Sequence, residues 1–521
     1  MIGNVKQLLS RVLDTRADRF AASLAQLDHE SPILAMQSMA EWLGRDSNRE
    51  LLQQDGITLM NAADDRLRHV ADRAMQELVT AANNQARTTL LLRAMFPYLR
   101  AVRDGYHESL NREVVHLAKK PATFAMLQTA VTNWLYWTGR YHIVHFLIEP
   151  GASRLPWHEI QPTVAYALSH GGGLSAVAAD GVTDAVHLQQ QLARLVLLAR
   201  SVSVDLQGRQ LLIADRIADS LAEFTRVSTK HSADTPFGHG GNTDNAPTVL
   251  SQLPTRAPEG RSGLYYGLEQ SLHELVGLEY QIKLNNALPD MLNPDGSLGV
   301  AETLIVIKHL KNRWSGKKMR RVSERRAISG NLTVAYEFAT IRKQLTQHAP
   351  QQQRSAFVRD EAKLEPGEIV DASLNGLGLK LTRHMGWLRV GQLLGIRIES
   401  DPVWRIGMVR RSAQAGQREM LAGVQLLGRE PEAISLSAKG AMSQAGLVAA
   451  APASDMVQAI YLRPAKGEAQ HLLICAGNAL DAGRTYRASS ARDGVIDLRV
   501  IATEDIGADC VIYSAQRADI S

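Results

Sequence analysis

The chain has 521 residues, of which 45% are hydrophobic and 21% are charged. This length exceeds what one hydrophobic core usually serves, so we expect about two to four domains, and the composition excludes a disordered chain. No stretch approaches the ~20 apolar residues of a membrane span, and Lys6 and Arg11 interrupt the N-terminal segment, which argues against a secretory start. The sequence therefore predicts a cytoplasmic protein without a membrane span.

The net charge of +5 is concentrated in one stretch. Residues 308–326, KHLKNRWSGKKMRRVSERR, contain nine Lys or Arg residues and one acidic residue. Since the whole chain has 58 basic and 53 acidic residues, the remainder holds 49 and 52, a balance of −3. Because the positive charge is local, it indicates a binding site rather than a generally cationic surface.

Residues 1–227 have the apolar spacing of helices. Apolar side chains recur every three or four residues, as in DDRLRHVADRAMQELVTAANN. Such segments predict a helical bundle or solenoid, with helix starts at Asp64 and Asn111, where N-cap residue types precede the periodic runs. Trp134 and Trp137 lie close together in one helical run, and we expect both to pack in the core.

The composition then changes twice along the chain. Pro, Gly, Asn, Ser and Thr crowd residues 228–263, which predicts a linker or a long loop. Residues 264–315 return to helical spacing and lead into residues 316–430, where short runs alternate apolar and polar side chains. The alternation predicts a small antiparallel sheet or barrel. Residues 431–521 predict a second small β-rich domain, or an extension of the first. The fold class is therefore multidomain α + β.

The alternation can be followed position by position. The apolar residues that recur every second position are Leu377/Leu379/Leu381, Leu394/Ile396/Ile398, Trp404/Ile406/Met408 and Val424/Leu426. Turn residues separate these runs, as expected for short strands of one sheet.

The candidates for catalysis and metal binding are weak. His142 and His145 are three residues apart, but no carboxylate or cysteine at ligand spacing accompanies them. The glycines of GHGG at 238–241 are not followed by the Lys-Ser/Thr pair of a phosphate loop. Cys475 and Cys510 lie in apolar runs and predict buried, reduced thiols. We therefore predict a protein that is not an enzyme and that uses neither a metal nor a cofactor.

Two motifs carry the functional prediction. An R-R-x-x-x-R pattern, at the entrance to a β-branched run, consists of Arg320, Arg321 and Arg325. Downstream, a D-x-S-x-x-G pattern consists of Asp371, Ser373 and Gly376. The second pattern alone is weak, because tight turns also use Asp, Ser, Asn and Gly.

In this order, and followed by alternating strands, the two motifs resemble the PilZ domain, the bacterial receptor module for cyclic di-GMP. The resemblance covers about residues 318–430 and includes Gly423-Val424-Gln425-Leu426, which is similar to the family's G-[VI]-x-F closing strand. It implies a six-stranded barrel that binds cyclic di-GMP with Arg320, Arg321, Arg325, Asp371, Ser373 and Gly376. The departure from the family is an insertion at about 336–366, between the motifs, which could sit at a hairpin tip or deform the site.

These residue types suit that ligand. The arginine fork can bind phosphate oxygens or a guanine O6/N7 edge, and its flat face stacks on purines. Asp371 can accept hydrogen bonds from a guanine N1–H and amine, Ser373 adds a hydroxyl, and Gly376 allows close approach. Because the arginine run connects the helical segments to the barrel, we expect a bound ligand to change the orientation of the barrel relative to residues 1–315 and so to signal to a protein partner through the N-terminal helical domain.

Two alternatives stay open. A nucleic-acid-binding protein would use the basic stripe 308–326, although Trp314 is its one aromatic residue and no stacking array accompanies it. A PilZ-like scaffold that binds no ligand would result if the insertion deforms the site. We favour the cyclic di-GMP receptor, because both motifs occur together and in the family's order.

Overall fold

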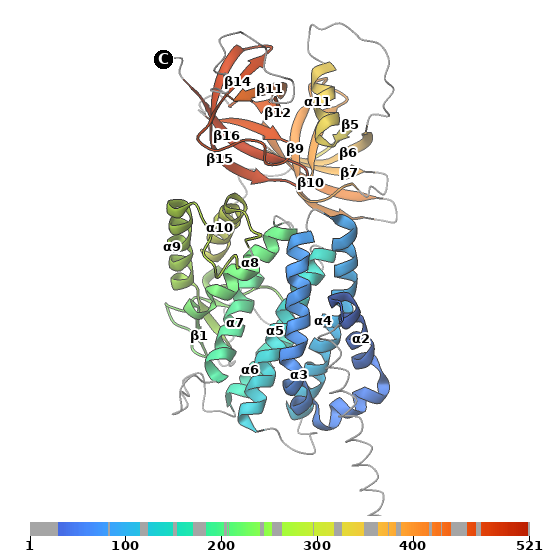
Figure 1. The fold of residues 1–521 in the computed structure, drawn as a ribbon, viewed down its shortest axis with the longest axis vertical. Helices are drawn as coiled ribbons and strands as arrows, with labels where there is room; N and C mark the ends of the chain where they lie inside the picture. Colours follow the sequence, from blue (N-terminus) through green and yellow to red (C-terminus); the bar gives the residue numbers. More distant parts are fainter. Residues whose placement is uncertain are drawn as a thin grey trace, which may run out of the picture. The chain divides into compact units, whose positions relative to one another are not determined.

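The computed structural model divides the chain into two compact units, Met1–Lys318 and Met319–Ser521 (Figure 1). Helices dominate the first unit and strands form the second, which confirms the predicted fold class. No helix in the described part of the chain combines the length and the apolar content of a membrane crossing. The structure describes residues 30–81, 84–114, 123–149, 154–169, 184–202, 206, 208–239, 244–252, 263–294, 296–316, 326–347, 363–373, 375–381, 387–415, 419–428, 430–438, 456–464 and 470–518.

The first unit is a helical bundle in which α3, α4 and α5 run side by side (Figure 1). Its helices are α2 Pro32–Gly44, α3 Asp46–Thr80, α4 Gln85–Val114, α5 Phe124–Ile148, α6 Trp157–Ser169, α7 Asp184–Ser201, α8 Gly208–Ser220, α9 Glu269–Asn285 and α10 Val300–Trp314. Thr123 caps α5, since its hydroxyl accepts a hydrogen bond from Met126 N at 3.4 Å. Trp134 and Trp137 of α5 are 1% and 0% exposed, so the predicted core packing is confirmed.

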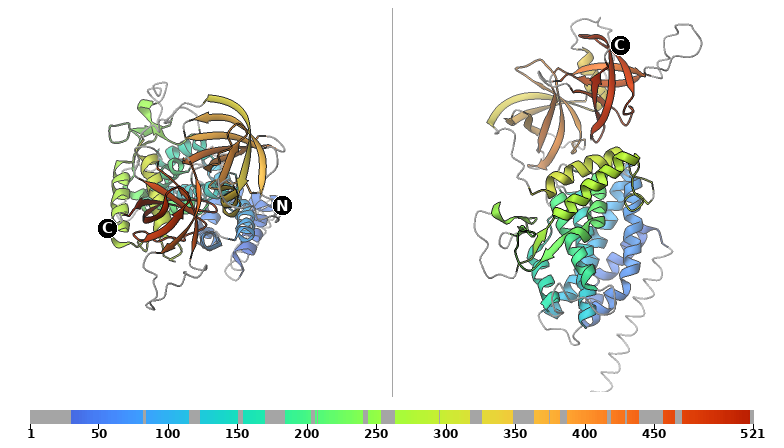
Figure 2. Two further views of the ribbon diagram at one scale, coloured as in Figure 1. Left: turned by 90° about the horizontal axis from the view of Figure 1, so that it is seen from above. Right: turned by 90° about the vertical axis from the view of Figure 1, so that its left-hand side faces the viewer.

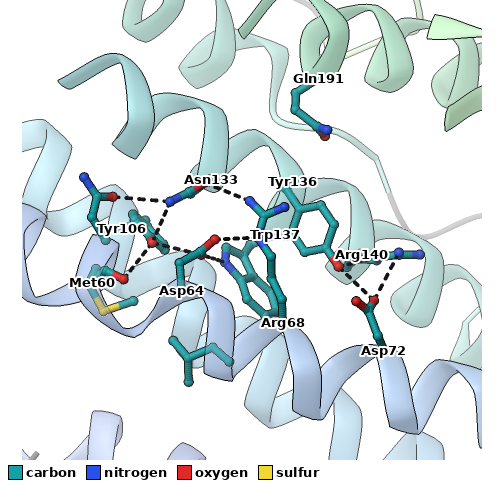
Figure 3. A network of polar contacts seen from close by, with 12 residues as sticks. Met60, Asp64, Arg68, Asp72, Tyr106, Asn133, Tyr136, Trp137, Arg140 and Gln191 are labelled. Atoms are coloured by element: carbon teal, nitrogen blue, oxygen red, sulfur yellow. Dashed lines mark hydrogen bonds and ion pairs between the residues drawn. The ribbon is translucent and has the colours of Figure 1, made fainter. Parts of the chain in front are cut away.

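A buried polar network joins the three central helices (Figure 3). The Asp64 carboxylate accepts hydrogen bonds from Tyr106 Oη at 2.9 Å and Trp137 Nε1 at 2.8 Å, and it pairs with Arg68. These partners satisfy a carboxylate that burial would otherwise penalise heavily. The predicted helix starts at Asp64 and Asn111 are wrong, because both residues lie inside helices, α3 and α4. The Asp64 side chain bonds to neighbouring helices instead of capping its own.

Part of the segment that the sequence predicted as a linker or long loop forms strands. The four-stranded sheet β1-β4-β2-β3 contains β1 Arg226–Ser228, β4 Tyr265–Gly267, β2 Phe237–Gly238 and β3 Thr248–Val249. Phe237 and Tyr266 pair across it and are buried in the same core as the helices. Strands of two or three residues are too short to show an alternation, which is why the sequence did not predict them.

The second unit begins with a closed six-stranded antiparallel barrel, which we call the first barrel. Its strand order is β10-β7-β6-β5-β8-β9, and the strands are β5 Arg326–Tyr336, β6 Leu364–Ser373, β7 Gly376–Leu381, β8 Leu393–Ile398, β9 Arg405–Gln414 and β10 Met420–Gly428. The alternating runs predicted from the sequence coincide with β7, β8, β9 and β10. Leu377, Leu379 and Leu381 all point into the barrel core, as the period of two requires.

The insertion between the two motifs lies at a hairpin tip. β5 and β6 pair from Arg326↔Ala372 at one end to Ala335↔Leu364 at the other, and the inserted helix α11, Phe338–Gln347, follows the second end. Nine residue steps of β5, from Arg326 to Ala335, separate the two ends, roughly 30 Å at the usual rise per residue. The described part of the insertion therefore follows the end of the β5–β6 pair that is far from Asp371.

The C-terminal strands close into a second barrel with its own core (Figure 2). Its order is β11-β12-β13-β16-β15-β14, and the strands are β11 Glu432–Ala438, β12 Val457–Leu462, β13 His471–Cys475, β14 Thr485–Ser490, β15 Gly494–Ile506 and β16 Val511–Arg517. A shared apolar cluster joins the barrels, in which Ile341 of α11 and Met408 of β9 meet Ile512 of β16. Cys475 and Cys510 are free and buried, which confirms the prediction from their apolar runs.

Candidate functional site

The outer face of the first barrel has a patch without side chains. Along β7 the leucines at 377, 379 and 381 point into the core, so the alternate positions, which include Gly376 and Gly378, face outward. Gly378 pairs with Gly423 of β10, which also lies between two core residues. A glycine within a strand has no side chain to keep other groups away, and it often marks a place where another group approaches the backbone closely. We call Gly376, Gly378 and Gly423 the glycine patch.

Asp371 covers one side of the glycine patch. It pairs with Gly378, and a Cβ built on that glycine would lie 2.6 Å from Asp371 Oδ1, so the carboxylate rests on the glycine. A bulge at Val370 precedes Asp371, since the β6–β7 register shifts between Ile369 and Asp371. Bulges redirect side chains at functional edges, and this one directs the carboxylate across the outer face.

Arg411 covers the other side. It pairs with Gly423, and a Cβ built there would lie 2.3 Å from Arg411 Nε. Both Gly378 and Gly423 are buried, although they face outward, because the two charged side chains lie over them. The strand row Asp371–Gly378–Gly423–Arg411 thus places a hydrogen-bond acceptor and a guanidinium on two adjacent glycines, within reach of one small polar ligand.

Ser373 and Gly376 complete the edge of the patch at the β6–β7 hairpin. They pair with each other, and Ser373 Oγ donates to Gly376 O at 3.4 Å. A Cβ on Gly376 would lie 3.3 Å from that hydroxyl and 3.2 Å from Val424 O. A larger residue would therefore crowd both the hydroxyl and the neighbouring strand. The structure thus brings Asp371, Ser373 and Gly376 of the predicted site together on one face.

The predicted arginines 320, 321 and 325 lie outside the described residues. The arginine that follows them, Arg326, is the first residue of β5 and pairs with Ala372, between Asp371 and Ser373. The chain therefore enters the first barrel from the arginine run directly beside the D-x-S-x-x-G segment. The assignment of these three arginines to the site stays a prediction.

Sequence reasoning missed Gly378 and Arg411. The signal for the glycine was G-L-G-L-K-L, in which two glycines occupy the outward positions of one strand. The signal for the arginine was the pair Arg410-Arg411 inside an alternating run, since two successive charged residues break the period of two and indicate a bulge. A bulge is indeed present between Val409 and Arg411 in the β9–β10 register.

The basic stripe lacks an exposed aromatic residue in its described part. Trp314, the one aromatic residue of residues 308–326, is 1% exposed, and its Nε1 donates to Ser201 Oγ at 2.9 Å. Lys311 pairs with Glu279, and Arg313 Nε donates to the Arg200 carbonyl at 3.2 Å. The described part of the stripe therefore presents no aromatic side chain on which a base of a single-stranded nucleic acid could stack.

The fold and this surface define the class of the first barrel. Residues 275–432 match the family model described as the middle PilZ domain of the cyclic-di-GMP receptor FimW. The first barrel is therefore a PilZ domain, as the two motifs predicted. The match runs from within α9 to the first residue of β11. No curated protein matches the chain.

Proposed function

We propose that the protein is a cyclic di-GMP receptor and that the glycine patch is its ligand surface. The observation that carries the proposal is the row Asp371–Gly378–Gly423–Arg411, an acceptor and a guanidinium that lie over two adjacent glycines in a PilZ barrel. A purine ring can approach the backbone there, Asp371 can accept from a guanine N1–H and amine, and Arg411 can donate to O6/N7 or to a phosphate oxygen.

In this proposal Arg320, Arg321 and Arg325 close over the ligand from the side of β5. Two phosphodiester charges need compensating cations, and arginine supplies both the charge and two parallel donors. Ser373 adds a hydroxyl at the rim. The ligand is the nucleotide itself, and the proposed activity needs no cofactor.

We infer that the bound ligand changes how the first barrel is oriented relative to residues 1–315, and that the helical unit passes this change to a protein partner. The support is the position of the arginine run, which lies at the boundary between the two units and directly before β5. A dianion that holds this run against Asp371 would order the segment, a known type of switch. Small-angle scattering and hydrogen exchange, with and without saturating ligand, test this part; unchanged profiles would contradict it.

Calorimetric titration of the full chain with cyclic di-GMP tests the receptor itself. We expect binding by the wild type and a loss of about 10- to 100-fold in affinity for Arg321→Ala and for Asp371→Ala, the effect of one charge-assisted hydrogen bond. Arg499→Ala, which removes an exposed arginine on the second barrel, is the matched control and should bind like wild type. Absence of wild-type binding, or equal binding by both site variants, would overturn the proposal.

A further inference from the structure

The outer side of β9 runs from the barrel–barrel contact to the glycine patch. Ile406 and Met408, two residues apart, belong to the apolar cluster shared with the second barrel. Arg411, further along the strand, lies over Gly423. Arg410 stands between them as the extra residue of the bulge, because Val409 pairs with Val424 while Arg411 pairs with Gly423. One strand therefore carries both surfaces, and Arg410 marks where they meet.

Arg410 is bonded in two directions. Its Nε donates to Gln425 Oε1 at 2.8 Å, and its terminal nitrogen forms an ion pair with Asp505 of β15, in the second barrel. Gln425 in turn pairs with Gly376, the last residue of the D-x-S-x-x-G segment. The Arg410 guanidinium is therefore one strand position away from the ligand surface, yet its charge is neutralised by a carboxylate of the other barrel.

The second barrel cannot withdraw that carboxylate easily, because its β15–β16 turn is fixed on the first barrel. Asp509 Oδ1 accepts a hydrogen bond from Leu393 N at 3.0 Å, and Ala508 N donates to Gly391 O at 2.8 Å. The two backbones also meet closely, since a Cβ on Gly507 would lie 2.6 Å from Gly391 O. With the turn held this way, Asp505 stays beside Arg410, and the arginine is the part that can move.

We propose that Arg410 is a further phosphate-binding arginine and that Asp505 restrains it, so that the second barrel sets the affinity of the first for its ligand. This inference rests on the proposed function. A phosphate at the glycine patch and the Asp505 carboxylate compete for the same guanidinium, whose fork suits both. Ligand binding therefore replaces the ion pair between Arg410 and Asp505 with one between Arg410 and a phosphate. By reciprocal linkage, a ligand bound at the glycine patch weakens the Arg410–Asp505 ion pair with the second barrel.

Four full-length proteins test this by calorimetry with cyclic di-GMP: wild type, Asp505→Asn, Arg410→Gln and the double variant. Asparagine keeps the shape and an acceptor oxygen but removes the charge. We expect Asp505→Asn to bind about three- to tenfold more tightly than wild type, and Arg410→Gln to bind about threefold more weakly. In the double variant, loss of the Asp505 charge should restore no affinity, because the arginine on which it acts is gone. A gain in affinity is not an effect that structural damage produces.

The control is Asp493→Asn, the same substitution in a carboxylate of the second barrel that pairs with Arg463 and Arg517, not with Arg410. It should bind like wild type. If the wild type binds cyclic di-GMP and Asp505→Asn binds no more tightly than the wild type, the inference is overturned. It is also overturned if Asp505→Asn tightens binding equally in the Arg410→Gln background. A wild type that does not bind at all overturns the proposed function, and this inference with it, and is distinguished from the other outcomes in the same titration.

Discussion

The two barrels have the same number of strands and the same closed antiparallel form, yet they use glycine differently. Every strand of the first barrel contains a glycine, whereas among the strands of the second barrel only β15 has one, Gly494 at its first position. Glycine inside a strand lowers stability, because glycine loses more backbone conformational entropy on folding than other residues do and has no side chain to pack. The first barrel therefore gives up stability along all its strands, and the second does not.

The glycines of the first barrel serve two purposes. Some allow tight packing: a Cβ on Gly407 would lie 2.5 Å from Val424 Cγ1, and one on Gly367 would lie 2.7 Å from Leu381 Cδ2. Three others, Gly376, Gly378 and Gly423, make the glycine patch, where the side chains of Asp371 and Arg411 lie on backbone. The comparison shows that the strands of the first barrel let other groups approach the backbone closely. The strands of the second barrel carry side chains at every position except Gly494.

The largest effect should come from filling a packing glycine. Gly407→Ala places a Cβ against the β-branched Val424, whose position is fixed by the core, and 3.1 Å from Gln425 O. We expect the free energy of unfolding of the second unit to fall by roughly 2–3 kcal/mol, the cost of overpacking. Gly330→Ala is the control, since a Cβ there meets only Ile369 Cδ1, at 4.0 Å. Denaturant titrations of both variants measure this, and equal stabilities would refute the distinction.

Filling a glycine of the patch should affect binding instead of stability. A Cβ on Gly378 meets only the Asp371 carboxylate within 3.0 Å, and that side chain can turn away. We expect Gly378→Ala to lose about tenfold in affinity for cyclic di-GMP, or ~1.4 kcal/mol, with an unfolding free energy within about 0.5–1 kcal/mol of wild type. Titration of the same preparation by calorimetry and by denaturant separates the two effects. Loss of stability without loss of binding would place Gly378 among the packing glycines.

The sequence predicts the parts of this surface that depend on residues close together in the chain, and it does not predict the parts that depend on residues far apart in the chain. The D-x-S-x-x-G residues and the strands around them follow from local alternation and turn chemistry, and Asp371, Ser373 and Gly376 do meet on one face. Arg411 could not be placed beside them, because it is contributed by another strand through a bulge and a register that depend on barrel closure. Asp64 was misread for the same reason: its partners Tyr106 and Trp137 come from other helices.

A smaller effect should come from a change that keeps the charge over the patch. Arg411→Lys retains the positive charge but lacks the planar fork that binds a phosphate or a guanine edge with two parallel bonds. We expect cyclic di-GMP affinity to fall about threefold. Arg397→Lys is the matched control, because Arg397 of β8 lies over Trp404, not over the patch. If both lysine variants bind like wild type, Arg411 contributes charge alone.

The smallest effect concerns pH and separates the two barrels. His471 Nδ1 of β13 shares a hydrogen bond of 2.7 Å with Tyr461 Oη. Burial, followed by the nearby Arg517, lowers the pKa of His471. Arg463 acts in the same direction and Asp493 opposes it. Because the folded state binds the proton less readily than the unfolded state, the stabilising contribution is complete above the ordinary histidine pKa of about 6.5 and is lost as the pH falls below it.

The first barrel provides the internal reference, since the described residues of 326–428 include no histidine. Hydrogen exchange of β13 and β7 amides at pH 7.5 and 5.5, corrected for intrinsic rates, should show lower protection in β13 alone at the acidic pH. His471→Asn keeps an acceptor near the position of Nδ1 but does not titrate, so it should remove the difference. A pH dependence that persists in this variant, or that β7 shares, would show that another group causes it. A difference confined to β13 would mean that acidification weakens the supporting barrel while the ligand-binding barrel keeps its structure.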